Sequence, residues 1–201
     1  GTLDNSFGIG GKVTTLIGVN SGAYSVIQQT DGKLVASGYG VVGGYENFAL
    51  ARYNPNGTLD TTFGDSGRLI SRVNQYSHAV FSLIQQADNK LVVAGHGSLT
   101  QGLILARYSP DGVLDASFDK DGVLDAPCAP GISCTANQVI QQADGKLVVV
   151  ADSYEDLDAL SGRENFSLIR YNSDGSLDGT FGDNGLTVTG IGPDTDVPFA
   201  V

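Results

Sequence analysis

Basic residues are scarce in this chain of 201 residues, which has 11 lysines and arginines against 22 acidic residues and a net charge of −11. A nucleic-acid binder needs Lys and Arg to replace the counterions condensed on phosphates. Long hydrophobic runs are also missing: the longest covers residues 147–151, far short of the roughly 18 apolar residues of a membrane span. These shortages exclude a nucleic-acid-binding protein and a membrane-spanning segment.

Residues that commonly carry catalysis are equally few. The chain has two histidines, His78 and His96, and no HExxH, GxSxG, P-loop or dinucleotide-binding motif. We therefore expect no enzymatic activity. The alternative is a carbohydrate-active enzyme of propeller type, in which paired carboxylates on one rim hydrolyse a glycosidic bond. The carboxylates that would serve it are Glu46, Glu155, Asp158 and Glu164.

What the chain has in abundance is repetition, together with 28 glycines. The phrase IQQTDGKLV of residues 27–35 returns, with small changes, at residues 84–92 and 140–148. The phrase GxLDxxF begins at residues 1, 57, 112 and 175, and a third phrase, FALARY in its first copy, begins at residues 48, 103 and 166. A repeat of about 56 residues therefore accounts for essentially the whole chain.

Each repeat predicts four short β-strands, in the first copy at residues 12–17, 23–29, 33–39 and 47–54. Asp-Gly and Asn-Gly turns punctuate these strands, and apolar residues alternate along them. Tandem four-stranded antiparallel units predict an all-β fold of β-propeller type; a β-solenoid is the alternative. We expect one repeat domain, with three complete units and a partial one, at about residues 1–56, 57–111, 112–174 and 175–201.

The combined pattern IQQxDGKLVVAG followed by FxLARYNxDGxLDxTFGxxG resembles the delta-60 repeat family, and the resemblance covers nearly the full chain. The resemblance implies a propeller-type fold within large, often exported bacterial proteins. It brings no agreed activity and no catalytic residues to transfer.

The end of the chain predicts that further repeats or a second copy of the chain complete the fold. The ending DVPFAV, residues 196–201, aligns with residues 22–26, just before the first IQQ phrase. We therefore expect the chain to be a piece of a longer polypeptide. Because propellers need roughly four or more blades to close, further repeats or a second copy would have to complete the ring and cover its open edges.

Repetition also separates scaffold from site. A residue that recurs in every unit serves the fold of the unit, whereas one that differs is free to serve a ligand. The Asp of GxLDxxF is expected to accept backbone N–H groups in its turn, and the Phe to pack between neighbouring blades. The scaffold residues, each with its equivalents in the other units, are Lys33, Arg52, Tyr53, Leu59, Asp60 and Phe63.

The segments that vary lie between the third and fourth predicted strands, at residues 39–47, 96–102 and 152–165. They combine aromatic rings with carboxylates, which suit the stacking of a sugar and recognition of its hydroxyls, or a cationic protein surface. The alternative is that they are solvated loops that only keep the surface soluble. The candidate ligand-binding residues are Tyr39, Tyr45, His96, Tyr154, Glu155 and Asp158.

Calcium is a second candidate ligand. Oxygen-bearing side chains lie two apart before a glycine in two connecting turns, as they do in calcium loops, but the full set of five or six ligands is missing. The same turns form equally well without a metal, which is the alternative. The residues concerned are Asp119, Asp121, Asn172 and Asp174.

The two cysteines, Cys128 and Cys134, flank Ala-Pro-Gly-Ile-Ser, which lets the chain turn back on itself. We expect a disulfide between them, which would stabilise the fold by roughly 2 kcal/mol and favours an exported setting. No other cofactor is expected.

Together these features predict a non-enzymatic binding or structural segment of a large bacterial extracellular or cell-surface protein. Its variable rim would mediate adhesion or ligand recognition. The carbohydrate-active enzyme and an architectural segment for filament or subunit assembly are the alternatives.

Overall fold

The chain folds into β-strands joined by turns. The computed structural model describes residues 1–72, 77–97, 102–126, 128, 132–158 and 161–190, with only the backbone at 155–158 and 161–163. Within these ranges there is no helix, and hence none able to cross a membrane. The strands are β1 (Ser21–Gln28), β2 (Leu34–Val42), β3 (Tyr45–Tyr53), β4 (Arg68–Ser71), β5 (His78–Gln85), β6 (Leu91–Gly97), β7 (Leu103–Tyr108), β8 (Val123–Ala126), β9 (Ile132–Gln141), β10 (Leu147–Asp158), β11 (Ser161–Tyr171) and β12 (Leu186–Thr189).

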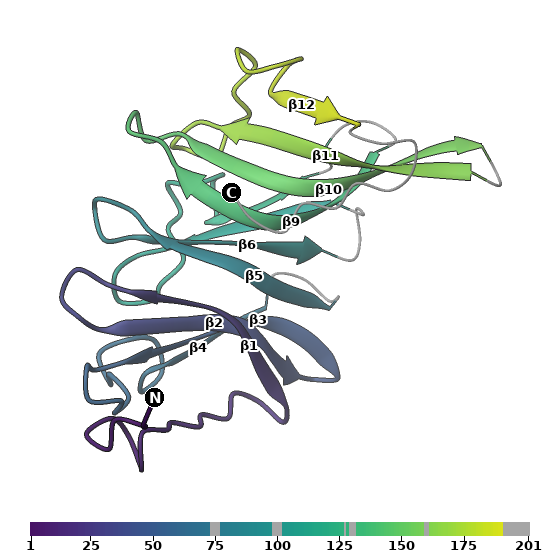
Figure 1. Ribbon diagram of the computed structural model, residues 1–201. Helices are drawn as coiled ribbons and strands as arrows, with labels where there is room; N and C mark the ends of the chain where they lie inside the picture. Colours follow the sequence, from purple (N-terminus) through teal and green to yellow (C-terminus); the bar gives the residue numbers. More distant parts are fainter. Residues whose placement is uncertain (73–76, 98–101, 127, 129–131, 159–160, 191–201) are drawn as a thin grey trace.

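The strands form three antiparallel sheets of four, with the orders β1-β2-β3-β4, β5-β6-β7-β8 and β9-β10-β11-β12. Figure 1 shows the sheets stacked in chain order. The first strands follow one another through the stack, because β1 contacts β5 and β5 contacts β9. The array is open and does not close into a ring. The all-β, propeller-type prediction is confirmed.

The sequence predicted that the first strand of each repeat lies in the same sheet as the next three strands, and this prediction was wrong. Residues 12–17 form no strand, whereas the equivalent residues of the next repeat form β4, the outermost strand of the preceding sheet. Each sheet therefore takes three strands from one repeat and the fourth from the next. Apart from an isolated bridge between Lys12 and Ile9, residues 12–17 pair with no strand, because no sheet precedes them in the described chain to offer a strand edge.

Two apolar cores fill the spaces between the sheets. Between the first and second sheets, Val35, Leu50 and Leu91 are fully buried. Between the second and third sheets, Val92 and Leu147 are equally buried. Successive residues of β6 thus enter opposite cores, as the two-residue period of a strand requires. The middle sheet is covered on both faces.

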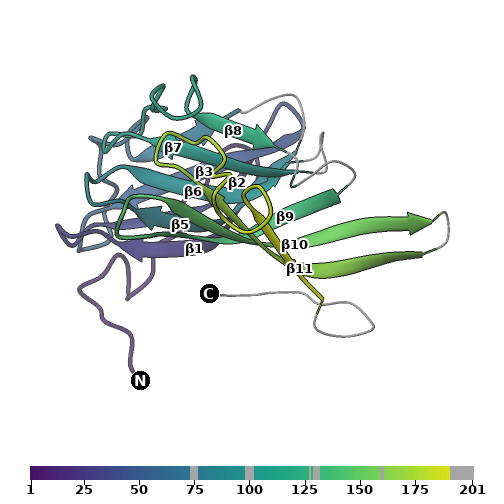
Figure 2. The same cartoon turned by 90° about the horizontal axis from the view of Figure 1, so that it is seen from above.

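In the variable segment at residues 152–165, residues 152–158 and 161–165 are strand rather than loop. β10 and β11 pair continuously from Leu147 opposite Tyr171 to Asp158 opposite Ser161, with one irregularity near the tip. This hairpin extends past the other sheets (Figures 1 and 2). Its acidic composition suggested a solvated loop. No Pro or Gly interrupts residues 152–158, so the pairing between β10 and β11 continues along this segment. The first variable segment, residues 39–47, is likewise hairpin, up to Val42 opposite Tyr45.

Candidate functional site

Each sheet has two unlike ends. The latch end carries the turn between the first two strands and the GxLDxxF segment; in the first sheet Leu34 pairs there with Gln28 and Tyr53. The hairpin end carries the hairpin between the second and third strands, where Val42 pairs with Tyr45. Recurring residues gather at the latch end, and varying residues at the hairpin end.

A buried aspartate organises each latch end. At the first sheet, Asp60 Oδ2 accepts a hydrogen bond from Arg52 Nε at 2.7 Å and forms an ion pair with Lys33 Nζ at 3.0 Å. Its other oxygen accepts the backbone N–H of Thr62 at 3.1 Å. The same Lys–Arg–Asp cluster recurs around Asp115 and Asp178. The expectation that this aspartate caps its own turn is confirmed.

The arginine also joins one repeat to the next. Arg52 Nη1 donates to the backbone carbonyl of Pro110, in the following repeat, and the guanidinium lies 4.6 Å from the ring centroid of Phe63. Phe63 is fully buried beneath Gly112, whose φ is 91°. A β-carbon on Gly112 would lie 3.0 Å from the Phe63 ring, so only glycine fits here without a shift. The recurring Phe therefore packs between repeats, as the sequence predicted.

These contacts change the acidity of the latch aspartates. Burial by itself would raise the pKa of Asp60, but hydrogen bonds from Thr62 and Lys33 and the charge of Arg52 outweigh it and hold that pKa well below its usual value. The pKa of Asp115 is lowered by the equivalent groups against the same burial. For Asp178, the hydrogen bond from its lysine is the largest cause of a lowered pKa.

The calcium candidates also lie at the latch end, in two adjacent turns. Asp174 Oδ1 accepts the N–H of Ser176 at 2.9 Å, and Asp121 Oδ1 accepts a backbone N–H at 3.0 Å. Asn172 donates to the hydroxyl of Ser176, and the N–H of Asp119 donates to the carbonyl of Asp174 at 2.9 Å. Within the described residues, no group of three or more His, Cys, Asp or Glu is placed to hold a metal ion. Calcium at these turns stays a prediction.

At the hairpin end, every first strand carries a β-bulge at the same place. The pairing register shifts at Tyr24 in β1, at Phe81 in β5 and at Asn137 in β9. A bulge adds a residue to one strand and re-aims its side chain, and bulges are over-represented beside functional sites. The three bulge residues occupy equivalent positions but differ in chemistry.

The residue beside each bulge varies in the same way. Tyr39, His96 and Asp152 hold one position on the second strands, opposite Gly22 and its equivalents. The ring centroids of Tyr24 and Tyr39 lie 5.8 Å apart. In the third sheet, the amide of the bulge residue instead donates to Asp152 at 2.8 Å. Each sheet therefore presents a bulge residue together with a second-strand neighbour, aromatic in the first sheet and polar in the third.

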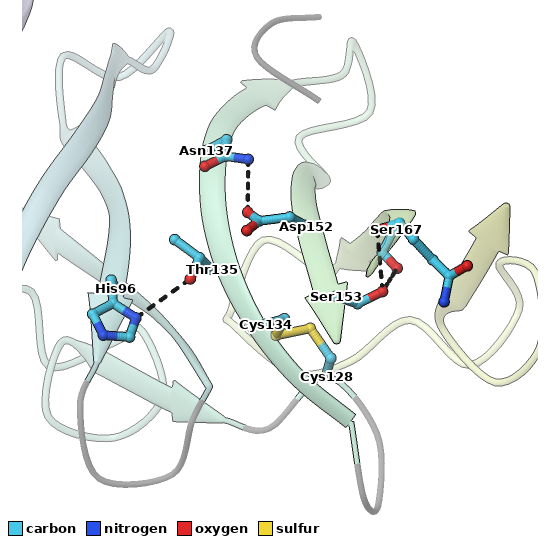
Figure 3. Close-up of a disulfide and its surroundings, with 9 residues drawn as sticks. His96, Cys128, Cys134, Thr135, Asn137, Asp152, Ser153 and Ser167 are labelled. Carbon is cyan, nitrogen blue, oxygen red and sulfur yellow. Dashed lines mark hydrogen bonds between the residues drawn. A yellow bond between two sulfur atoms is a disulfide. The ribbon is translucent and has the colours of Figure 1, made fainter. Parts of the chain in front are cut away.

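A pocket of about 410 Å³ opens where the hairpin ends of the second and third sheets meet. It is lined by His96 of β6, residues 133–135 of β9, residues 152–154 of β10 and Glu164 of β11. The Oγ1 of Thr135 lies 3.4 Å from Nδ1 of His96, across the junction between the sheets (Figure 3). The pocket thus combines an imidazole, a phenol, hydroxyls and two carboxylates.

The disulfide forms part of this pocket wall. Cys128 and Cys134 are bonded, with their Cα atoms 6.0 Å apart. Cys134 pairs with Ser153 in the sheet and lines the pocket (Figure 3). Ser153 is buried, and its hydroxyl lies 2.6 Å from that of Ser167. The disulfide thus ties Cys128 to β9 beside this buried pair of hydroxyl groups.

The structure brings some predicted ligand residues together and separates others. His96 and Tyr154 meet in the pocket, whereas Tyr39 lies in the first sheet, outside the pocket and against Tyr24. Tyr45 lies apart with its ring 5.8 Å from the guanidinium of Arg72. Glu155 and Asp158 belong to β10, and their side chains lie outside the described part of the structure.

Other site residues escaped the sequence reasoning. Asp152 and Thr135 line the pocket, and Tyr24 and Phe81 are bulge residues in the strand before each IQQ phrase. The signal that could have found them is an alignment of the repeats, because each of these positions changes type between units while its neighbours recur.

The two pocket carboxylates lie on neighbouring strands. Asp152 is opposite Phe166 in the register, and Glu164 is opposite Tyr154. They are therefore diagonal neighbours on one face, a relation that places their β-carbons somewhat less than about 7–8 Å apart. No ion pair joins either carboxylate to another residue whose side chain the structure describes. Asp152 Oδ1 already accepts a hydrogen bond from Asn137, which leaves Oδ2 of Asp152 and the carboxylate of Glu164 to hydrogen-bond a ligand.

The fold and the repeated latch define a β-propeller-type repeat protein. The chain belongs to the family described as a domain of unknown function (DUF5122) beta-propeller, which matches residues 29–63, 86–118 and 142–181, more than half of the chain. Each match runs from the last Gln of the IQQ phrase to the Phe of GxLDxxF. This is the repeat family that the sequence resembles, and the family pattern ends on the latch.

No curated protein sequence matches the chain. Among solved structures, the chain is similar to a mannose phosphorylase from Leishmania mexicana in complex with phosphate ion, at 10% identity and a TM-score of 0.32. That similarity covers 79% of this chain and 67% of the phosphorylase. A TM-score of this size supports no inference about activity.

Proposed function

We propose that the chain is a non-enzymatic carbohydrate-binding repeat segment of a bacterial extracellular or cell-surface protein, with its ligand site at the hairpin end. One observation carries the proposal: residues that differ between repeats line a pocket, while residues that recur build the latch. Binding residues are disproportionately carried on variable connections positioned by a rigid scaffold.

The pocket chemistry fits a sugar. Tyr154 is 40% exposed and offers a ring face to the apolar side of a pyranose. Asp152 and Glu164 offer acceptors for its hydroxyl groups, and a few such polar groups are enough to fix the orientation of a small ligand. The net charge of −11 opposes polyanions such as sulfated or uronic-acid polymers. We therefore place the ligand among neutral or cationic glycans.

The disulfide supports export. Disulfides persist in oxidising compartments and are rare in the cytosol, and this one forms a wall of the proposed site. Adhesion would then follow from glycan binding at a surface. Further repeats or a second copy would cover the open faces of the first and third sheets, whose edges otherwise invite pairing.

A carbohydrate-active enzyme is the second candidate, and the carboxylate pair favours it. Asp152 and Glu164 are diagonal neighbours on one face of the sheet, and from these positions their carboxyl groups can reach the roughly 6.5–9.5 Å separation that inverting glycosidases use. In that reaction one protonated carboxyl donates its proton to the glycosidic oxygen, while the other carboxylate deprotonates the attacking water.

Calorimetric titration with oligosaccharides, followed by analysis of the recovered sugar, separates the two candidates. Saturable binding that is lost in Glu164→Gln, with the sugar recovered intact, supports the binding protein. Cleaved sugar, with cleavage lost in the same variant, supports the enzyme. Glu46→Gln is the matched control, because both glutamates stand in a Glu-Asn-Phe sequence at the start of the third strand, but Glu46 is outside the pocket.

A further inference from the structure

The aromatic residues of the first two sheets form a second ligand surface. Tyr24 is 55% exposed, and its ring centroid lies 5.8 Å from that of Tyr39 and 5.4 Å from that of Phe81. Tyr24 therefore bridges the first sheet to the second. An exposed ring held between two others is rigid and costs little entropy to use for stacking.

This surface is continuous with the pocket through equivalent positions. Phe81 is the bulge residue of the second sheet, and His96 stands beside it in the position that Tyr39 holds in the first. His96 in turn lines the pocket and lies across the junction from Thr135 of the third sheet. Because β1, β5 and β9 follow one another through the stack, these positions form one row.

We infer that this row binds a linear oligosaccharide across all three sheets, with sugar rings stacked at its aromatic end and hydroxyls bound at its polar end. The row is defined by the bulge residues Tyr24, Phe81 and Asn137 and their neighbours Tyr39, His96 and Asp152. This inference rests on the proposed function, since the polar end is the pocket.

The chemistry of the row favours a chain over a single sugar. Its aromatic end lacks any charged member and offers stacking faces, while its polar end offers Asn137 and Asp152 as hydrogen-bonding groups. A monosaccharide would fill only the pocket. A longer chain would gain contacts at each sheet that it crosses, which is an effect of linked sites.

The test compares oligosaccharide ladders of two to six sugars from cellulose, xylan, mannan, amylose and chitin, titrated against the wild type and two variants. Tyr24→Ala removes the exposed ring. Val26→Ala is the control. Val26 is 65% exposed on the same strand and pairs with Ala36, but its side chain lies on the face of β1 away from the second sheet.

For one ladder we expect wild-type affinity to rise with chain length. Tyr24→Ala should weaken the longest sugars by about tenfold, the loss of one good aromatic contact, and leave the shortest unchanged. Val26→Ala should change neither. Because the chain has no Trp, a tyrosine difference spectrum on binding reports ring contact directly, and it should shrink in Tyr24→Ala for long sugars alone.

Two results would contradict binding along the row, and they differ in whether the proposed function survives. Affinity independent of length, or an equal loss at all lengths in Tyr24→Ala, would leave the pocket as the whole site and the proposed function intact. Failure of every ladder to bind would remove the proposed function and the row together.

Discussion

The latch end and the hairpin end of each sheet share one backbone but follow different rules. At the latch end the same three side chains, such as Lys33, Arg52 and Asp60, return in every repeat with nearly the same distances. At the hairpin end equivalent positions change from Tyr39 to His96 to Asp152. The difference supports the proposal that the hairpin end binds a ligand, while the latch end stabilises the fold.

This division has a physical basis. The latch joins consecutive repeats, so a change in one unit would leave a buried charge unpaired and a turn of the next unit unsatisfied. The hairpin end is held in register by main-chain pairing, which does not depend on side-chain type. The two ends can therefore be broken separately, and the predictions below do so.

Acid should produce the largest effect, at the latch end. Asp60, Asp115 and Asp178 have folded-state pKa values below that of an unfolded aspartate, about 3.9. The stability they contribute is present above that unfolded value and is lost as the pH falls toward the folded one. We expect the free energy of unfolding, measured with urea, to fall steeply below about pH 5, by more than any single substitution causes.

The control is a chain in which Asn replaces all three latch aspartates. Its unfolding free energy should be lower at neutral pH and should fall less steeply across the acid range. Some dependence on pH remains because the pKa values of Asp4, Asp31, Asp111 and Asp174 are also lowered. A wild type that keeps its full stability at about pH 2 would contradict the role given to the latch.

Asp60→Asn should give the largest effect of a single substitution. Asp60 is 5% exposed, and its loss leaves Arg52 buried without a counter-charge. We expect a loss of about 3 kcal/mol in unfolding free energy. Asp31→Asn is the matched control: Asp31 also contacts Lys33, at 3.4 Å, but its side chain is 54% exposed, and we expect a change below about 0.5 kcal/mol.

The disulfide should contribute less than the latch. Replacing Cys128 and Cys134 by Ser removes a ring closed over a sequence separation of 6 residues, and we expect a loss of roughly 2 kcal/mol in unfolding free energy. Because the same bond fixes a pocket wall, sugar affinity should fall as well. Unchanged affinity in a folded double variant would separate the disulfide from the site.

Much of the fold could be predicted from the sequence because the latch repeats. The recurrence of Arg52, Asp60 and Phe63 in every unit marked them as scaffold, and their burial and contacts agree. The turn residues and alternation likewise gave the strands of the middle of each repeat. A residue pattern that recurs three times within one sequence can be recognised as scaffold from that sequence alone.

What was missed depends on partners distant in the chain. Residues 12–17 and β4 have similar sequences but only β4 has a neighbouring edge, so the strand at 12–17 could not be excluded locally. The length of the β10–β11 hairpin depends on pairing between its strands. The bulges at Tyr24 and Phe81 leave no local signature, because they are defined by the register with the next strand.

A substitution at the hairpin end should change recognition and leave stability nearly intact. Tyr154 is 40% exposed on a strand held by main-chain pairing, so Tyr154→Ala should alter the free energy of unfolding by less than about 0.5 kcal/mol. Sugar affinity should fall by about tenfold through loss of one stacking face. A large loss of stability with unchanged binding would reverse the assignment of the two ends.

Calcium should have the smallest effect and decides whether the latch end is purely structural. The carboxylate oxygens of Asp121 and Asp174 already accept N–H groups of their own turns, which leaves them poorly placed to gather the six or more oxygens that calcium prefers. A site with a millimolar Kd would raise the unfolding free energy by about 1 kcal/mol in roughly 5 mM calcium. We expect a smaller shift than this between calcium and EDTA, and the same shift in Asp174→Asn. A larger shift that Asp174→Asn abolishes would place a ligand site at the latch end too, and the separation of stability from recognition would then hold only for organic ligands.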